Sequence, residues 1–163
     1  MNRFLRTDTS LTLAAQRAVL GLVLFPHGLQ KTAGWFGGYG FDGTMGYFTG
    51  ALGIPAPLAF LVIVAETAGA VGLVLGLGTR LAAAGAALVM AGAAVMVHAP
   101  HGFFMNWGGQ AGGEGFEYHL LALALALPLV VRGAGRFSID AWLSARLGRD
   151  GAAAVQGAAA RAV

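Results

Sequence analysis

The sequence contains no cysteine among its 163 residues. This absence excludes disulfide bonds, thiolate metal sites, Cys-ligated iron–sulfur clusters and cysteine nucleophiles within the chain. Charged residues are also scarce, at 10% of the chain, whereas a soluble domain carries about a quarter. Because 57% of the residues are hydrophobic and the mean hydropathy is +0.71, the composition is that of a membrane protein.

Several common functional patterns are missing as well. The basic residues are scattered and are not interleaved with stacking aromatics, so no nucleic-acid surface is expected. The glycine pairs lack the strand–turn–helix context of a dinucleotide or phosphate loop. A signal peptide is disfavoured because Arg17 interrupts the first apolar run and no A-x-A site follows promptly. We therefore expect an uncleaved first helix.

The apolar run at residues 57–77 is long enough to cross a bilayer and contains one carboxylate, Glu66. A charge inside the hydrocarbon layer is costly, so it normally faces the interior of a helix bundle and has a partner. Small residues at helical spacing in the same run allow a second helix to approach closely; they are Ala65, Gly69, Gly72 and Gly76.

Apolar segments of similar length predict an all-α, integral membrane four-helix bundle within residues 1–150. We expect its helices at residues 11–29, 57–77, 81–97 and 116–131. In the first of these, one stripe of small or polar residues should face the bundle; it consists of Arg17, Gly21, Leu24, Gly28 and Lys31, with His27 at its edge.

The segment after the fourth helix predicts a short amphipathic C-terminal helix. Ser138 or Asp140 could cap it, and Trp142, Leu143 and Leu147 would form its apolar side. The Ala-rich tail at 151–163 has little to bury, so we expect it to be disordered.

The basic residues predict the orientation of the bundle in the cell membrane. Almost all of them lie at the two termini or in the 76–80 turn, which places these segments in the cytoplasm by the positive-inside rule. The long loops at 30–56 and 98–116 then face outward. The first is rich in aromatics and is interpreted as an interfacial anchor, with a short helix near Thr44–Leu52, or as a lid over a lipophilic site.

Two hypotheses compete for Glu66. Helix depth at about 1.5 Å per residue brings Arg17 within reach, so the two residues could form a buried structural ion pair. Alternatively, Glu66 could be a proton-relay or substrate-binding group.

A second polar group is expected at the outer ends of the helices, where all four histidines lie. Its members are His27, Lys31, His98, His101, Glu114, Glu117 and His119. Their spacing matches no metal motif, so no metal is expected. The histidines could be hydrogen-bonded polar caps, or they could exchange protons with a quinone headgroup, since their pKa lies near working pH.

The order of these segments resembles the DoxX family of small four-helix membrane proteins. The matching pieces are RAVLGLVLFPHGLQKTAG at 17–34, ETAGAVGLVLGLGTRLAA at 66–83, His98, HGFF at 101–104 and GAGRFSID at 133–140. Arg17, His27, Lys31, Glu66, Arg80 and His98 match the family pattern. The resemblance implies a membrane subunit associated with oxidoreductase systems and the quinone pool, with electrons supplied by a partner.

We therefore predict a membrane subunit that binds a lipophilic molecule, a quinone, in the outer half of the bundle. The alternative is a non-catalytic anchor or assembly subunit of a larger membrane complex. A transporter is disfavoured because inverted repeats are not visible. The sequence contains no complete catalytic constellation, and it leaves homo-oligomerisation open. The predicted proton-handling residues are Glu66 and His27, and the predicted ligand-binding residues are Arg17, Lys31, His98 and His119.

Overall fold

The computed structural model describes residues 7–109 and 111–147, and within these ranges the regular elements are all helical, as predicted. The expected tail at 151–163 lies outside the described residues. The long helices are α1 (Leu11–Thr32), α3 (Ala56–Leu75), α4 (Thr79–Ala93) and α5 (Glu117–Arg132). The short elements are η1 (Trp35–Gly37), α2 (Gly40–Gly46), η2 (Tyr47–Ala51), η3 (Ala94–His98), η4 (Ala99–His101) and an unlabelled helix over 139–147.

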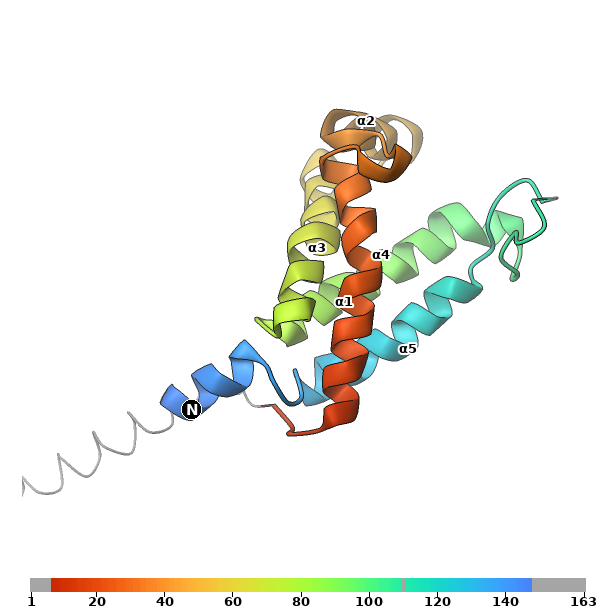
Figure 1. The fold of residues 1–163 in the computed structure, drawn as a ribbon. Helices are drawn as coiled ribbons and strands as arrows, with labels where there is room; N and C mark the ends of the chain where they lie inside the picture. The colour runs from red at the N-terminus through yellow and green to blue at the C-terminus, as the bar shows by residue number, and fades with distance from the viewer. Residues whose placement is uncertain (1–6, 110, 148–163) are drawn as a thin grey trace, which may run out of the picture.

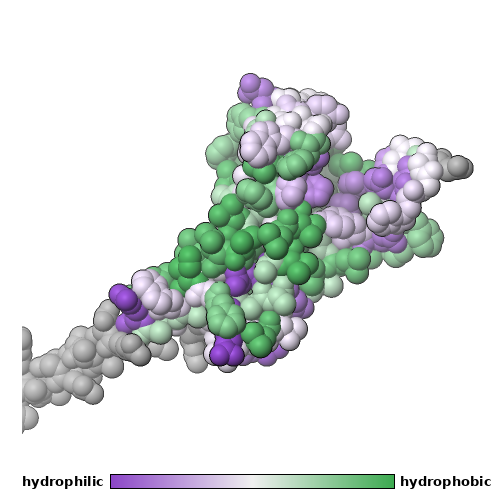
Figure 2. Space-filling view, in the orientation of Figure 1, coloured by the Kyte–Doolittle hydropathy of each residue, from purple (hydrophilic) through white to green (hydrophobic). Residues whose placement is uncertain are grey.

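The long helices form two pairs that converge at one end and diverge at the other (Figure 1). Helix α1 packs on α3, and α4 packs on α5, while α3–α4 and α1–α5 contacts join the pairs. We call the end that contains Leu11, Leu75, Thr79 and Arg132 the narrow end. The end that contains Thr32, Ala56, His101 and Glu117 is the wide end. Figure 2 shows that the surface is hollowed between the pairs at the wide end, with hydrophilic side chains gathered there.

The contact between α1 and α3 depends on two glycines. A Cβ on Gly21 would lie 2.9 Å from the carbonyl oxygen of Ala70, and a Cβ on Gly28 would lie 2.7 Å from the Cα of Thr67. Real side chains do not tolerate such distances, so glycine is required for the two backbones to come this close. The predicted inward stripe on α1 is confirmed, because Arg17, Gly21, Leu24 and Gly28 are all buried.

The small residues of α3 allow α4 to pack closely against it. The sequence predicted that a second helix approaches α3 at these residues. A Cβ on Gly85 would lie 3.2 Å from the Cβ of Ala65, and a Cβ on Gly72 would lie 3.7 Å from the Cβ of Ala82. Glu66 is not on this side of α3. It shares the face of Ile63, Ala70 and Leu73, which is buried toward the rest of the bundle.

Two segments among the described residues are long and apolar enough to cross a membrane, Ala56–Leu75 and Thr79–His101. The second is α4 with its continuation through η3 and η4. Its outward face carries Leu81, Leu88 and Val95, each about three-quarters exposed, which is expected of a surface that contacts lipid acyl chains. Membrane crossing by α1 and α5 stays a prediction.

Helix boundaries differ from the expected ones mainly at the wide end. Helix α1 continues past residue 29 to Thr32, even though Pro26 lies inside it. The 30–56 segment is not simply a loop, because helical turns run through 40–51, where a short interfacial helix was expected. Trp35, Phe36 and Tyr39 project from this region and are exposed, as an interfacial anchor requires.

Candidate functional site

The central feature of the wide end is an ion pair between α1 and α3. The Nζ of Lys31 lies 3.1 Å from Oε1 and 3.0 Å from Oε2 of Glu66. Glu66 is only 3% exposed, whereas the Lys31 side chain is 22% exposed. The carboxylate is therefore enclosed by protein, and Lys31 connects it to the surface of the bundle.

The predicted ion pair between Arg17 and Glu66 is wrong. Arg17 instead donates hydrogen bonds to the carbonyl oxygens of Leu73 and Val74, at 2.6 and 2.7 Å. It also donates to those of Ala134 and Phe137, both at 3.0 Å. Arg17 thus caps the C-terminus of α3 and holds the segment that follows α5. It has no place in the wide-end site to which ligand binding was assigned.

The antiparallel register of α1 and α3 explains why Glu66 pairs with Lys31 and not with Arg17. Gly21 lies against Ala70 and Val74, and Gly28 lies against Glu66 and Thr67. Glu66 is therefore opposite the last turns of α1, where Lys31 lies, and Arg17 is opposite the end of α3. Helix ends carry carbonyl oxygens without helical partners, which makes them ready acceptors for a guanidinium.

Tyr118 brings α5 into the same region. Its ring lies 6.4 Å from that of His27 on α1, centroid to centroid. The Tyr118 hydroxyl is buried without a hydrogen-bond partner among the described residues. A buried donor without a partner costs about 1–3 kcal/mol, so this hydroxyl is a natural contact for a bound molecule.

The remaining predicted histidines meet each other next to Tyr118. The rings of His98 and His119 lie 4.2 Å apart between centroids, and His119 is buried. The Nδ1 of His98 is 2.8 Å from the carbonyl oxygen of Glu114. The ring of His119 in turn lies 5.6 Å from that of Tyr118. Polar side chains therefore follow one another across the wide end, from Lys31 and Glu66 to His98 and His119.

Sequence reasoning missed Tyr118. It proposed both neighbours of this residue, Glu117 and His119, as polar members of the outer group. In the first turn of α5, Tyr118 faces His27 of α1 and His119 faces His98 of η3, whereas the carboxylate of Glu117 accepts the backbone N–H of Met105 at 2.9 Å. A tyrosine between two polar residues at a helix start was the only available signal.

Metal ligation finds no geometric support in the described parts of the chain. Residues 7–109 and 111–147 contain no group of three histidine, aspartate or glutamate side chains that could hold a metal ion. The carboxylate of Glu114 is used by the loop, since it accepts the backbone N–H of Asn106 at 2.5 Å. His101 lies against Gly113, where a Cβ would be 2.6 Å from its Nε2.

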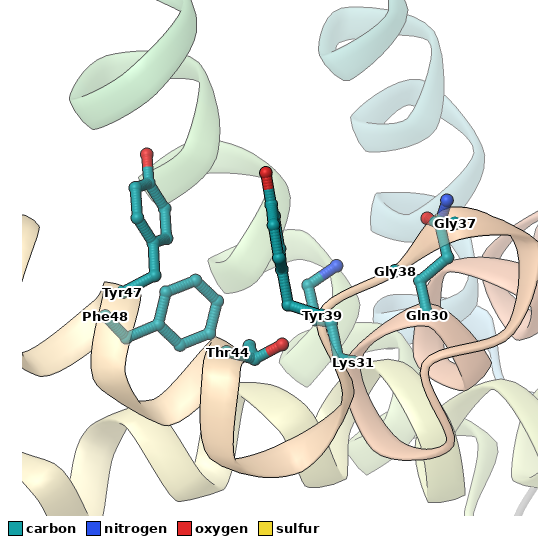
Figure 3. Close-up of a pocket in the computed structure, with 8 residues that line it drawn as sticks. All are labelled: Gln30, Lys31, Gly37, Gly38, Tyr39, Thr44, Tyr47 and Phe48. Carbon is teal, nitrogen blue, oxygen red and sulfur yellow. The ribbon is translucent and has the colours of Figure 1, made fainter.

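A pocket of about 240 Å³ is lined in part by Lys31. It lies between the end of α1 and the turns of α2 and η2, and Figure 3 shows the side chains that line it. Tyr39, Tyr47 and Lys31 extend to the same side of the turn that carries Thr44 (Figure 3). The pocket thus combines aromatic faces with one ammonium group that is already bound to a buried carboxylate. Such a mixture suits a flat ring with carbonyl or other acceptor oxygens.

Comparison with known proteins agrees with the resemblance seen in the sequence. The DoxX family model matches residues 12–99. A protein of Bacillus subtilis (strain 168) named "Putative oxidoreductase CatD" is 31% identical over 113 residues, which cover 69% of this chain and 74% of that protein. No solved structure matches this chain. The family match contains α1, α3, α4 and η3, and with them Lys31, Glu66 and His98. This chain belongs to the DoxX family.

Proposed function

We propose that this membrane protein binds a quinone or a quinone-like lipophilic molecule at its wide end, as a subunit of a membrane oxidoreductase system. The proposal is carried by one observation: Lys31 belongs both to the buried ion pair and to the lining of the pocket. Its ammonium group is paired with the buried Glu66 and also forms part of the wall of the aromatic pocket. A ligand oxygen in the pocket would accept a charge-assisted hydrogen bond from a lysine that Glu66 holds in position.

The neighbouring groups are suited to proton exchange. Reduction of a quinone to a quinol takes up two electrons and two protons. Glu66 is paired with Lys31, and the rings of His27, Tyr118, His119 and His98 follow one another at the same end of the bundle. All of these side chains can hold or pass protons. The electrons would come from a partner redox protein. The name of the Bacillus subtilis relative is in keeping with an oxidoreductase role.

Quinone binding is tested with the full chain in lipid nanodiscs, titrated with a short-chain ubiquinone. The variant Lys31→Gln/Glu66→Gln replaces the ion pair by a neutral pair of similar shape, so folding should persist. We expect affinity to fall about tenfold to a hundredfold, because a charged hydrogen bond contributes about 1.5–3 kcal/mol. Arg132→Gln, at the narrow end, is the control and should bind like the wild type.

Unchanged affinity in the double variant would refute the role of Lys31 and Glu66. If the purified protein binds no quinone and retains a stoichiometric polypeptide instead, the anchor or assembly function is supported. Mass spectrometry of the protein purified in mild detergent separates these outcomes, because it detects lipids, quinones and polypeptides together.

The proposed orientation places the narrow end, with both termini, in the cytoplasm of the cell. Arg17, Arg80, Arg132, Arg136 and Arg146 all belong to the narrow end or its extension, whereas Lys31 is at the wide end. This distribution follows the positive-inside rule. Because the chain lacks cysteine, single substitutions can report topology directly. A membrane-impermeant maleimide should label Tyr39→Cys in intact cells and Arg136→Cys only after permeabilisation, and the reverse pattern would overturn the orientation.

A further inference from the structure

The segment 136–147, here called the C-terminal arm, is held firmly at the narrow end. Ser138 begins its helix as predicted, because its Oγ accepts the backbone N–H of Ala141 at 3.2 Å. Asp140 does not cap this helix. Its carboxylate accepts the backbone N–H groups of Gly78 and Thr79, at 2.8 and 2.9 Å, and so caps α4. The arm therefore leaves the bundle in a fixed direction (Figure 1).

The side of the arm helix opposite Asp140 is exposed and amphipathic. Trp142 and Arg146 lie one turn apart on it, with the Arg146 guanidinium carbon 4.4 Å from the centre of the Trp142 ring. Just before the helix, the guanidinium carbon of Arg136 lies 5.1 Å from the centre of the Phe137 ring. The arm thus presents two arginine–aromatic stacks on its surface. A stacked guanidinium keeps its N–H donors directed outward in its plane, where they can bind a phosphate in bidentate fashion.

The backbone at Phe137 is adapted to this arrangement. Phe137 has a φ of 54°, a conformation that is unfavourable for a bulky side chain. Its carbonyl oxygen accepts a hydrogen bond from Arg17, while its ring is 76% exposed. The exposed ring of Phe137 is thus available for contact with an apolar layer.

The two arginine side chains of the arm have no ionic partner among the described residues. The backbone N–H of Arg136 donates to the carbonyl oxygen of Ser10 at 3.1 Å, but in the described part of the chain the guanidinium groups of Arg136 and Arg146 form no ion pair or hydrogen bond. Asp140 is engaged with α4, and Asp8 is paired with Arg132. The arm lies beside the C-terminal end of α3, because the backbone N–H of Asp140 donates to the carbonyl oxygen of Gly76 at 2.9 Å, and the last turns of α3 and α5 expose the apolar side chains of Leu75 and Val131. The ends of such apolar helices are expected at the level of the headgroup layer, if these side chains contact acyl chains.

We propose that the C-terminal arm is a binding site for anionic phospholipid headgroups. Arg136 and Arg146 contact the lipid phosphates, and the rings of Phe137 and Trp142 lie among the glycerol and upper acyl segments. The occupant is a lipid because positive charge, exposed aromatic rings and continuity with the apolar bundle surface occur together. This inference is independent of quinone binding at the wide end.

The test measures lipid retention by native mass spectrometry. The full chain is purified in mild detergent and titrated with phosphatidylglycerol or phosphatidylcholine. We expect the wild type to retain phosphatidylglycerol preferentially. Each of Arg136→Gln and Arg146→Gln should weaken this retention about fivefold, since an arginine near an anionic surface contributes about that factor. Arg136→Lys keeps the charge but loses the planar stack, so its effect should be smaller.

Arg132→Gln is the matched control, because it removes the same charge from the same end but from a residue already paired with Asp8. It should retain phosphatidylglycerol to within about twofold of the wild type. Equal retention of the two lipids by the wild type would overturn the proposal. An equal loss in the control would also overturn it, because binding would then follow net charge alone. A circular dichroism spectrum and a melting curve for each variant separate lost lipid binding from lost folding.

Discussion

The two ends of this bundle use their polar residues differently. At the narrow end, side chains contact the backbone: Arg17 reaches the end of α3, Arg80 reaches the carbonyl oxygens of Val130 and Val131, and Asp140 caps α4. At the wide end, the buried side chains of Glu66 and His119 instead contact other polar side chains, those of Lys31 and His98.

This difference indicates that the polar residues of the narrow end stabilise the fold, whereas those of the wide end form the candidate site. Helix termini expose backbone groups that need partners, and the narrow end supplies these partners from distant segments of the chain. The helices therefore converge there. The wide end leaves its helix ends further apart and collects titratable groups between them. Substitutions at the narrow end should mainly change stability, and those at the wide end should mainly change ligand binding.

The largest expected effect is that of Arg17→Leu. This substitution leaves four buried or half-buried carbonyl oxygens without their charged donor. We expect the free energy of unfolding to fall by about 4 kcal/mol or more, measured by denaturant titration in mixed micelles. Arg132→Leu, which removes an exposed ion pair, should cost less than about 1 kcal/mol. Similar losses in both variants would contradict the role given to the narrow end.

Lys31→Met should have the second-largest effect. We expect it to lower the free energy of unfolding by about 3 kcal/mol, because it leaves the carboxylate of Glu66 buried without its partner. This is the one wide-end substitution for which we expect a large loss of stability. Adding Glu66→Gln removes the unpaired charge and should restore most of the melting temperature. If the double variant is as unstable as Lys31→Met alone, the loss comes from packing and not from charge.

Asp140→Ala should lower stability by about 1–2 kcal/mol, the usual cost of losing a helix N-cap. Asp42→Ala offers a comparison at the wide end. Asp42 is an exposed acidic residue in the first turn of α2, so its removal should change stability by about 0.5 kcal/mol or less. Thermal unfolding followed by circular dichroism measures both.

The smallest effect on stability is expected for Tyr118→Phe. The hydroxyl forms no hydrogen bond with any described residue, so the free energy of unfolding should change by less than about 0.5 kcal/mol. Quinone affinity should nevertheless fall about tenfold, if this hydroxyl contacts the ligand. Thr79→Val removes a similarly unpartnered hydroxyl at the narrow end and should leave both quantities unchanged. A Tyr118→Phe variant with unaltered quinone affinity would remove Tyr118 from the site.

Helix periodicity was sufficient to predict the inward face of α1 and the small-residue face of α3. Both follow from local spacing, and packing in the structure confirms them. The partner of Glu66 was not predictable in the same way. Depth counting ended the first helix at residue 29 and so placed Lys31 at the boundary, whereas α1 continues to Thr32 and the lysine side chain reaches Glu66.

The long-range contacts of the C-terminal segment could not be predicted from the sequence either. The pattern around Ser138 and Asp140 predicted a helix start, and Ser138 fulfils this local role. That Asp140 caps α4 depends on the path of the chain between α5 and the arm, which no local signal specifies. Tyr118 was missed for a related reason, because its environment is created by α1 and α3 and not by its neighbours in sequence.

The glycine contacts of α1 have a mechanical consequence. Because backbone meets backbone at Gly21 and Gly28, α1 and α3 have little room to slide or rotate against each other, and together they behave as one stiff rod. Arg17 and Lys31 are then fixed at opposite ends of this rod. A change at Lys31 should therefore not reach the narrow end through a shift of α1 along α3.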